Sequence, residues 1–132
     1  MHILMIEDNE SVCEMMEMFF EKENWNVTFV HDGKEGLDEY LDNSEKYNLI
    51  ILDIMLPSMD GIQICREIRK VDKEVPVIML TANAIEGAKE DYLEKGFVGY
   101  LSKPITGDKI KDMILKFAPE DLIIWRDNEE SV

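Results

Sequence analysis

The sequence predicts an α/β domain built on a doubly wound parallel sheet. Strand-like and helix-like segments alternate through residue 117, and no low-complexity linker separates them. The strand-like segments are short runs rich in β-branched residues and leucine, which are typical of strands buried on both faces of a parallel sheet. They begin twenty to thirty residues apart, and this spacing leaves room for a crossover helix between successive strands. These observations favour five repeated strand–helix units.

Each unit is expected to contain one apolar strand followed by one amphipathic helix. The strands are expected at Ile3–Ile6, Asn26–Val30, Leu49–Leu52, Val77–Leu80 and Val98–Ser102. Apolar residues three and four positions apart predict the helices, which are expected at Glu10–Glu23, Lys34–Leu41, Ile62–Val71, Glu86–Lys95 and Gly107–Phe117. Gly96 follows the fourth helix, at a position where glycine readily ends a helix.

The length of the chain fits one domain and a short tail. A chain of 132 residues is long enough to form a hydrophobic core. We expect the domain to span residues 1–118. Residues 119–132 form the expected C-terminal tail, in which the apolar stretch Leu122–Trp125 precedes an acidic end. We expect this tail to be partly disordered.

The composition opposes several classes of function. The chain has 29 acidic and 14 basic residues and a net charge of -15, which repels nucleic-acid backbones, so direct binding of nucleic acid is not expected. No apolar run approaches the roughly 20 residues of a membrane-spanning helix, so no membrane insertion is expected. Cys13 and Cys65 have no partner at metal-ligand spacing, and we expect them to be packed thiols of a cytoplasmic protein.

Polar side chains follow four of the expected strands at the point where each strand ends. The first strand is followed by Glu7 and Asp8, the third by Asp53, the fourth by Thr81 and the fifth by Lys103. Open α/β sheets bind their ligands at the edge where parallel strands end. We therefore expect these five side chains to gather at one edge of the sheet.

These residue types suit metal-assisted phosphoryl chemistry. Clustered carboxylates repel one another unless a proton or a cation lies among them, and oxygen ligands without imidazole or thiolate suit Mg²⁺, or Mn²⁺ in its place. The charge of Lys103 and the hydroxyl of Thr81 can hold the oxygens of a phosphoryl group on Asp53. Taken singly, a polar residue at a strand end is more often a helix cap or an ion-pair partner. The coincidence of all of them favours a functional site.

Other kinds of site find no support in the sequence. His2 and His31 lie where neither can form a catalytic triad with the carboxylates. The glycines form neither a G-x-G-x-x-G nor a Walker pattern, so a nucleotide-binding loop is not expected.

Short motifs occur in a characteristic order between residue 2 and about residue 117. They are the acidic pair Glu7-Asp8, Asp53 with Leu56-Pro57 and Met59-Asp60-Gly61 behind it, Thr81-Ala82, and Lys103-Pro104. This ordered set resembles the receiver (REC) domains of two-component response regulators, the family of the chemotaxis regulator. The resemblance implies a flavodoxin-like (βα)5 fold with strand order 2-1-3-4-5. In that order the first and third strands are neighbours, so the acidic pair would face Asp53.

The resemblance also implies a role for each residue of the site. Asp53 would accept the phosphoryl group and would bind the metal together with Glu7, Asp8 and the backbone carbonyl of Met55. Glu7 replaces the commoner aspartate and lengthens one arm of the metal site, so direct and water-mediated ligation both remain open.

Two residues would contact the phosphoryl group, and one of them would belong to a switch. Thr81 and Lys103 would hold the phosphoryl oxygens. Tyr100 matches the aromatic position that in this family turns inward when the threonine moves toward the phosphate. The alternative for Tyr100 is an ordinary half-buried strand tyrosine.

The expected function is therefore a Mg²⁺-dependent signalling switch in a phosphorelay, not an enzyme beyond self-phosphorylation and autodephosphorylation. A sensor histidine kinase or a histidine phosphotransfer protein would donate the phosphoryl group, and the output protein or domain is unknown. Segments around Thr81 and Tyr100 look most like receivers attached to, or served by, hybrid sensor histidine kinases.

Two alternatives from other classes remain open. One is a phosphohydrolase with an aspartyl nucleophile. Such enzymes that resemble the haloacid dehalogenase family carry a second acid two residues after the nucleophile, where this chain has Met55. The other is a passive phosphate sink or binding module.

Overall fold

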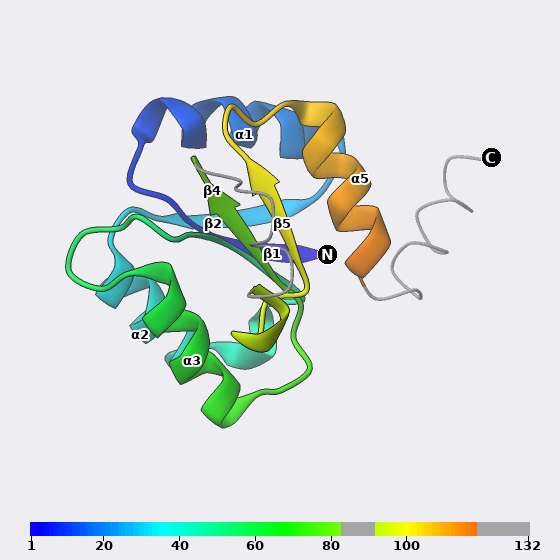
Figure 1. The fold of residues 1–132 in the computed structure, drawn as a ribbon. Coiled ribbons are helices and arrows are strands. Elements are labelled where there is room, and N and C mark those ends of the chain that lie inside the picture. Colours follow the sequence, from blue (N-terminus) through cyan, green and yellow to red (C-terminus); the bar gives the residue numbers. More distant parts are fainter. Residues whose placement is uncertain (83–91, 119–132) are drawn as a thin grey trace.

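A parallel five-stranded sheet forms the centre of the molecule, with helices on both of its faces (Figure 1). The structure is a computed structural model that describes residues 1–82 and 92–118. The strand order is β2-β1-β3-β4-β5, and all four pairings between neighbouring strands are parallel. The predicted fold class and the strand order implied by the resemblance are both confirmed.

The five strands lie close to their predicted positions: β1 His2–Ile6, β2 Asn26–Val30, β3 Leu49–Asp53, β4 Val77–Thr81 and β5 Gly99–Ser102. Strands β3 and β4 each run one residue further than expected. Their ladders continue through the pairs Asp53 with Leu80 and Thr81 with Ser102. Asp53 and Thr81 are therefore the last residues of their strands and are held by the sheet itself.

The described helices are α1 Glu10–Lys22, α2 Gly33–Asp42, α3 Gly61–Val71 and α5 Gly107–Phe117, with a short 3-10 helix at Ser44–Lys46. Each α-helix is preceded by a residue whose side chain accepts a hydrogen bond from a first-turn amide, and this satisfies a donor without a partner inside the helix. These caps are Asn9, Asp32, Asp60 and Thr106. Helices α2 and α3 begin one residue earlier than expected, at Gly33 and Gly61, because the caps Asp32 and Asp60 directly precede these glycines.

Most of the expected helix Glu86–Lys95 lies outside the described residues. Residues 92–94 are helical, and the chain then turns at Gly96, whose φ of 99° is in the left-handed region that favours glycine. The amide of Phe97 donates to the carbonyl of Tyr92 at 3.0 Å. Gly96 thus ends this helix as predicted.

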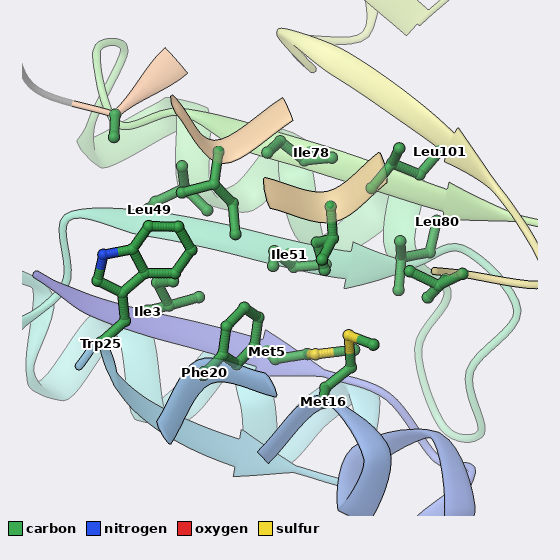
Figure 2. Packing of buried hydrophobic residues seen from close by; sticks show 14 residues of the cluster. Ile3, Met5, Met16, Phe20, Trp25, Leu49, Ile51, Ile78, Leu80 and Leu101 are labelled. Atoms are coloured by element: carbon green, nitrogen blue, oxygen red, sulfur yellow. The ribbon is translucent and has the colours of Figure 1, made fainter. Parts of the chain in front are cut away.

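The two faces of the sheet bury two separate hydrophobic clusters because successive strand residues point to opposite faces. Helices α1 and α5 cover one face (Figure 1), where Met16 and Phe20 of α1 and Ile110 of α5 belong to the same buried cluster as Ile51 of β3; Met16, Phe20 and Ile51 are seen in Figure 2. Helices α2 and α3 cover the other face. Full burial of one such side chain contributes about 1.5–3 kcal/mol. The strand ends are therefore anchored from both sides.

Both cysteines are buried and free, as the sequence predicted. Burial raises the pKa of Cys13 to about 12 and that of Cys65 to about 11, so neither thiol is reactive near neutral pH. Within the described residues, no helix has the length and apolar character needed to cross a membrane.

Candidate functional site

The sheet brings the polar strand-end residues together as the sequence predicted. Glu7 follows β1, and its amide still donates to the carbonyl of Val30 in β2 at 3.0 Å. Asp53 ends β3, the neighbour of β1, and Thr81 ends β4, the neighbour of β3. Lys103 follows β5, and its amide donates to the carbonyl of Thr81 at 2.9 Å.

Three carboxylates form the centre of this edge. One oxygen each from Glu7, Asp8 and Asp53 can be chosen so that all three atoms lie within 4.8 Å of one another. Glu7 is fully buried, Asp53 is 2% exposed and Asp8 is exposed. The cluster therefore opens to solvent on the side of Asp8.

Lys103 lies between the two buried carboxylates. Its Nζ atom is 2.7 Å from Oε1 of Glu7 and 2.8 Å from Oδ2 of Asp53, and it donates a hydrogen bond to the latter. The lysine side chain is 26% exposed. One cation thus offsets the repulsion between two acids that the fold places side by side.

The pKa values of this cluster reflect burial first and charge second. Burial raises the pKa of Glu7 to about 7, against the lowering effect of its contacts with Lys103 and with the amide of Asn9. Burial alone would lower the pKa of Lys103, but its hydrogen bonds and charge interactions with Asp53 and Glu7 outweigh burial and raise it. Glu7 therefore changes its charge near neutral pH, while Lys103 stays positive.

The donor set fits a hard divalent cation such as Mg²⁺. It offers carboxylate oxygens and no imidazole or thiolate, which is the ligand chemistry that Mg²⁺ prefers. Among the described residues, the buried Oε1 atom of Glu7 has the ammonium group of Lys103 as its partner, at 2.7 Å.

Backbone amides orient the two buried acids. The amide of Met55 donates to Oδ1 of Asp53 at 3.0 Å, and the amide of Asn9 donates to Oε2 of Glu7 at 3.1 Å. Met55 thus lies beside the acceptor through its backbone, while its side chain is 75% exposed. Asn9 is not among the site residues that the sequence predicts. Its position as a helix cap directly after the acidic pair is the signal that could have indicated its contact with Glu7.

The two residues expected to form the switch lie on neighbouring strands. Thr81 is buried, with 5% of its surface exposed. Tyr100 is half-buried in β5, opposite Met79, and its ring lies against that of Tyr92 with centroids 5.1 Å apart. Tyr100 thus lies on the strand next to that of Thr81, and its role in a switch stays a prediction.

The histidines lie apart from the acidic side chains. His2 bonds to Thr28 and, through its amide, to Asn48 at the beginning of the sheet. The ring of His31 lies 3.0 Å from the backbone oxygen of Glu7, and neither histidine belongs to the carboxylate cluster among the described residues.

Comparison with known proteins agrees with this geometry. A family model of the response regulator receiver domain matches residues 3–115. The uncharacterized transcriptional regulatory protein YclJ of Bacillus subtilis (strain 168) is 54% identical over 106 residues, which cover 80% of this chain and 45% of that protein. The response regulator ArlR of Staphylococcus aureus (strain Mu50 / ATCC 700699) is 41% identical over 108 residues, which cover 82% and 48%. The chain spans about half the length of the curated relatives it matches.

A similar solved structure contains a magnesium ion. It is the receiver domain of the sensor histidine kinase PA1611 from Pseudomonas aeruginosa PAO1, with a magnesium ion coordinated in its active site cleft. It is 32% identical, has a TM-score of 0.78, and the match covers 88% of this chain and 95% of that chain. From the family match over residues 3–115, the shared fold and the acidic edge of the sheet, the chain belongs to the response regulator receiver domains, the phospho-acceptor modules of two-component signalling.

Proposed function

We propose that Asp53 is the residue that accepts the phosphoryl group. The observation that carries this proposal is the pair of contacts on its carboxylate, which binds Lys103 through Oδ2 at 2.8 Å and the amide of Met55 through Oδ1 at 3.0 Å. Asp53 is held at the end of a buried strand, so its oxygens are oriented before a donor arrives. Such positioning supplies much of the catalysis in phosphoryl transfer.

The transfer is an in-line displacement at phosphorus. A carboxylate oxygen of Asp53 forms the new O–P bond while the bond from phosphorus to the histidine nitrogen of the donor breaks, and the electron pair of that bond stays on the imidazole. Lys103 and Thr81 contact the transferred oxygens and offset their charge. Mg²⁺, or Mn²⁺, held by Glu7, Asp8, Asp53 and the Met55 carbonyl supplies further charge neutralisation when bound.

The donor is a sensor histidine kinase or a histidine phosphotransfer protein. The relative YclJ is named as a transcriptional regulatory protein and is about twice as long as the match, which supports an output through a further domain that contacts DNA. The net charge of the whole chain, -15, opposes direct contact with DNA, and we assign residues 1–118 to the receiver domain. Attachment to a hybrid sensor kinase stays a prediction from the sequence.

Incubation with a small phosphodonor, such as acetyl phosphate, tests the proposal. The intact mass is expected to increase by one phosphoryl group in the presence of Mg²⁺ and to stay unchanged in excess chelator, because the charge on the transferred group needs the cation. Phosphorylation that proceeds undiminished in chelator would contradict the metal requirement. Multiple turnovers on small phosphate esters would instead indicate a phosphohydrolase.

The switch is expected to require the hydroxyl of Thr81. Thr81→Ala should still be phosphorylated, but the surface near Tyr100 should no longer respond, because no hydroxyl moves toward the phosphoryl oxygens. Hydrogen exchange over residues 92–105, with and without beryllofluoride, measures the response. Thr81→Ser keeps the hydroxyl and is expected to respond like the wild type. A wild type whose protection does not change would favour a passive phosphate sink.

A further inference from the structure

The loop that follows Asp53 contacts the start of helix α2, which precedes it in the sequence by more than twenty residues. This loop, residues 54–60, is fixed at its base by the amide of Gly61, which donates to the carbonyl of Ile54 at 3.1 Å. Its far end reaches the junction between β2 and α2. There the amide of Gly33 donates to the carbonyl of Pro57 at 3.3 Å.

Ser58 makes the second contact at the far end of the loop. Its hydroxyl accepts a hydrogen bond from the amide of Lys34 at 3.1 Å and donates one to Oδ2 of Asp32 at 2.9 Å. Asp32 itself caps α2 by accepting from the amide of Glu35 at 3.0 Å. These bonds lower the pKa of Asp32, the one from the Glu35 amide most and the one from Ser58 next.

The loop therefore serves as part of the N-terminal cap of α2. The first turn of a helix has amides without partners inside the helix. In α2 the first of them bonds to the Pro57 carbonyl, the second to the Ser58 hydroxyl and the third to the Asp32 carboxylate. Two of the three partners come from the loop that begins at the phosphoryl acceptor.

Close packing shows that this contact leaves no free space. A Cβ atom on Gly33 would lie 2.0 Å from the backbone oxygen of Met59, so only glycine fits there. Ser58 has a φ of 65°, in the left-handed region that serine rarely adopts. Its two hydrogen bonds offset that unfavourable backbone conformation.

The position of Met55 depends on this loop. Its side chain is 75% exposed, so packing contributes little to fixing its backbone. Its amide nevertheless holds Oδ1 of Asp53 at 3.0 Å. The backbone between Ile54 and Gly61 is restrained at its base, by the packing of Ile54, Leu56 and Met59 on a hydrophobic cluster, and at its far end by the contact with α2.

We propose that Ser58, with Asp32 as its partner, is a positioning residue that holds the loop of Met55 in the conformation that binds the divalent cation. The inference rests on the proposed function, since it assumes that Met55 and Asp53 belong to the metal site. Ser58 is not one of the proposed metal ligands. It acts by restricting the backbone before the cation binds, and this lowers the entropy lost on binding.

Three variants of Ser58 distinguish the effect of its hydroxyl group from the effect of its left-handed backbone conformation. Ser58→Ala removes both hydrogen bonds and keeps the unfavourable φ, whereas Ser58→Gly removes the bonds and adopts that φ freely. Ser58→Asn tolerates a left-handed φ, and its amide can accept from Lys34 and donate to Asp32. Asp38→Asn is the matched control, because Asp38 is an exposed acid of α2 whose ion pair with Lys34 does not involve the loop.

Calorimetric titration with Mg²⁺ and hydrogen exchange of residues 54–60 without metal provide the readouts. Ser58→Ala and Ser58→Gly are expected to weaken Mg²⁺ binding about three- to tenfold, the range that corresponds to one net hydrogen bond, and to speed exchange in the loop. Ser58→Asn should recover most of the affinity, and Asp38→Asn should match the wild type. The rate of phosphorylation at saturating Mg²⁺ should change less than the affinity, because bound cation itself orders the loop.

Two results would overturn the inference. One is an unchanged Mg²⁺ affinity and an unchanged loop exchange in both Ser58→Ala and Ser58→Gly. The other is an equal loss of affinity in Asp38→Asn. Because titration and exchange need no phosphodonor, a wild type that binds Mg²⁺ without accepting phosphate would contradict the proposed function and leave the role of Ser58 testable by the same measurements.

Discussion

Asp53→Asn is expected to abolish phosphorylation while the fold stays intact. The amide is a far weaker nucleophile than the carboxylate, so the new O–P bond cannot form at a useful rate. Its oxygen can still accept from the amide of Met55, which now lies 3.0 Å from Oδ1. Lys103 keeps its ion pair with Glu7. Intact mass after treatment with a phosphodonor measures the loss, and circular dichroism checks the fold.

Asp60→Asn makes the same chemical change in the same loop and serves as the control. Asp60 caps α3 by accepting from the amide of Gln63 at 2.9 Å, and asparagine caps helices about as well as aspartate. This variant should be phosphorylated like the wild type. A phosphate of equal stability on the Asp53→Asn protein would show that the nucleophile is a different residue.

The sequence is informative about the fold wherever one local pattern decides the structure. The run Leu49–Leu52 is buried on both faces of the sheet, and apolar runs of that kind predict central strands directly. Helix starts were less accurate, because α2 and α3 begin at glycines behind the caps Asp32 and Asp60. The order of the strands came from the family resemblance, since the pairing of distant strands has no local signal.

In the site, too, local patterns in the sequence predict some features, and contacts between distant segments determine the others. Polar residues at strand ends predicted which side chains meet, because parallel strands end at one edge. The bridging position of Lys103 between Glu7 and Asp53 depends on how three different strands end, and the sequence does not predict it. The bond between Ser58 and Asp32 joins residues 26 positions apart in two loops, and no periodicity in the sequence indicates such a contact.

Lys103→Met is expected to destabilise the protein and to slow phosphorylation. It leaves Glu7, which is fully buried, and Asp53, which is 2% exposed, without their cation. Breaking a buried ion pair costs about 3–5 kcal/mol, and the partial exposure of Lys103 reduces this to about 1–3 kcal/mol. The lost charge near the transferred oxygens should slow the reaction about a hundredfold. Denaturant titration and intact-mass kinetics measure the two effects.

The loss of stability should depend on pH. Burial already raises the pKa of Glu7 from 4.5 to about 7, and removing Lys103, whose contact lowers this pKa, raises it further. A group whose pKa is raised in the folded state binds more protons there than in the unfolded state. The free energy of unfolding therefore falls as the pH rises from the unfolded pKa of the group to its folded pKa. The destabilisation relative to wild type should therefore be larger at about pH 8 than at about pH 5. Lys70→Met is the control, because Lys70 pairs with Glu67 at 2.9 Å between two exposed side chains and its loss should cost about 0–1 kcal/mol without slowing the chemistry. Equal, pH-independent losses in the two lysine variants would contradict a central role for Lys103 between the two acids.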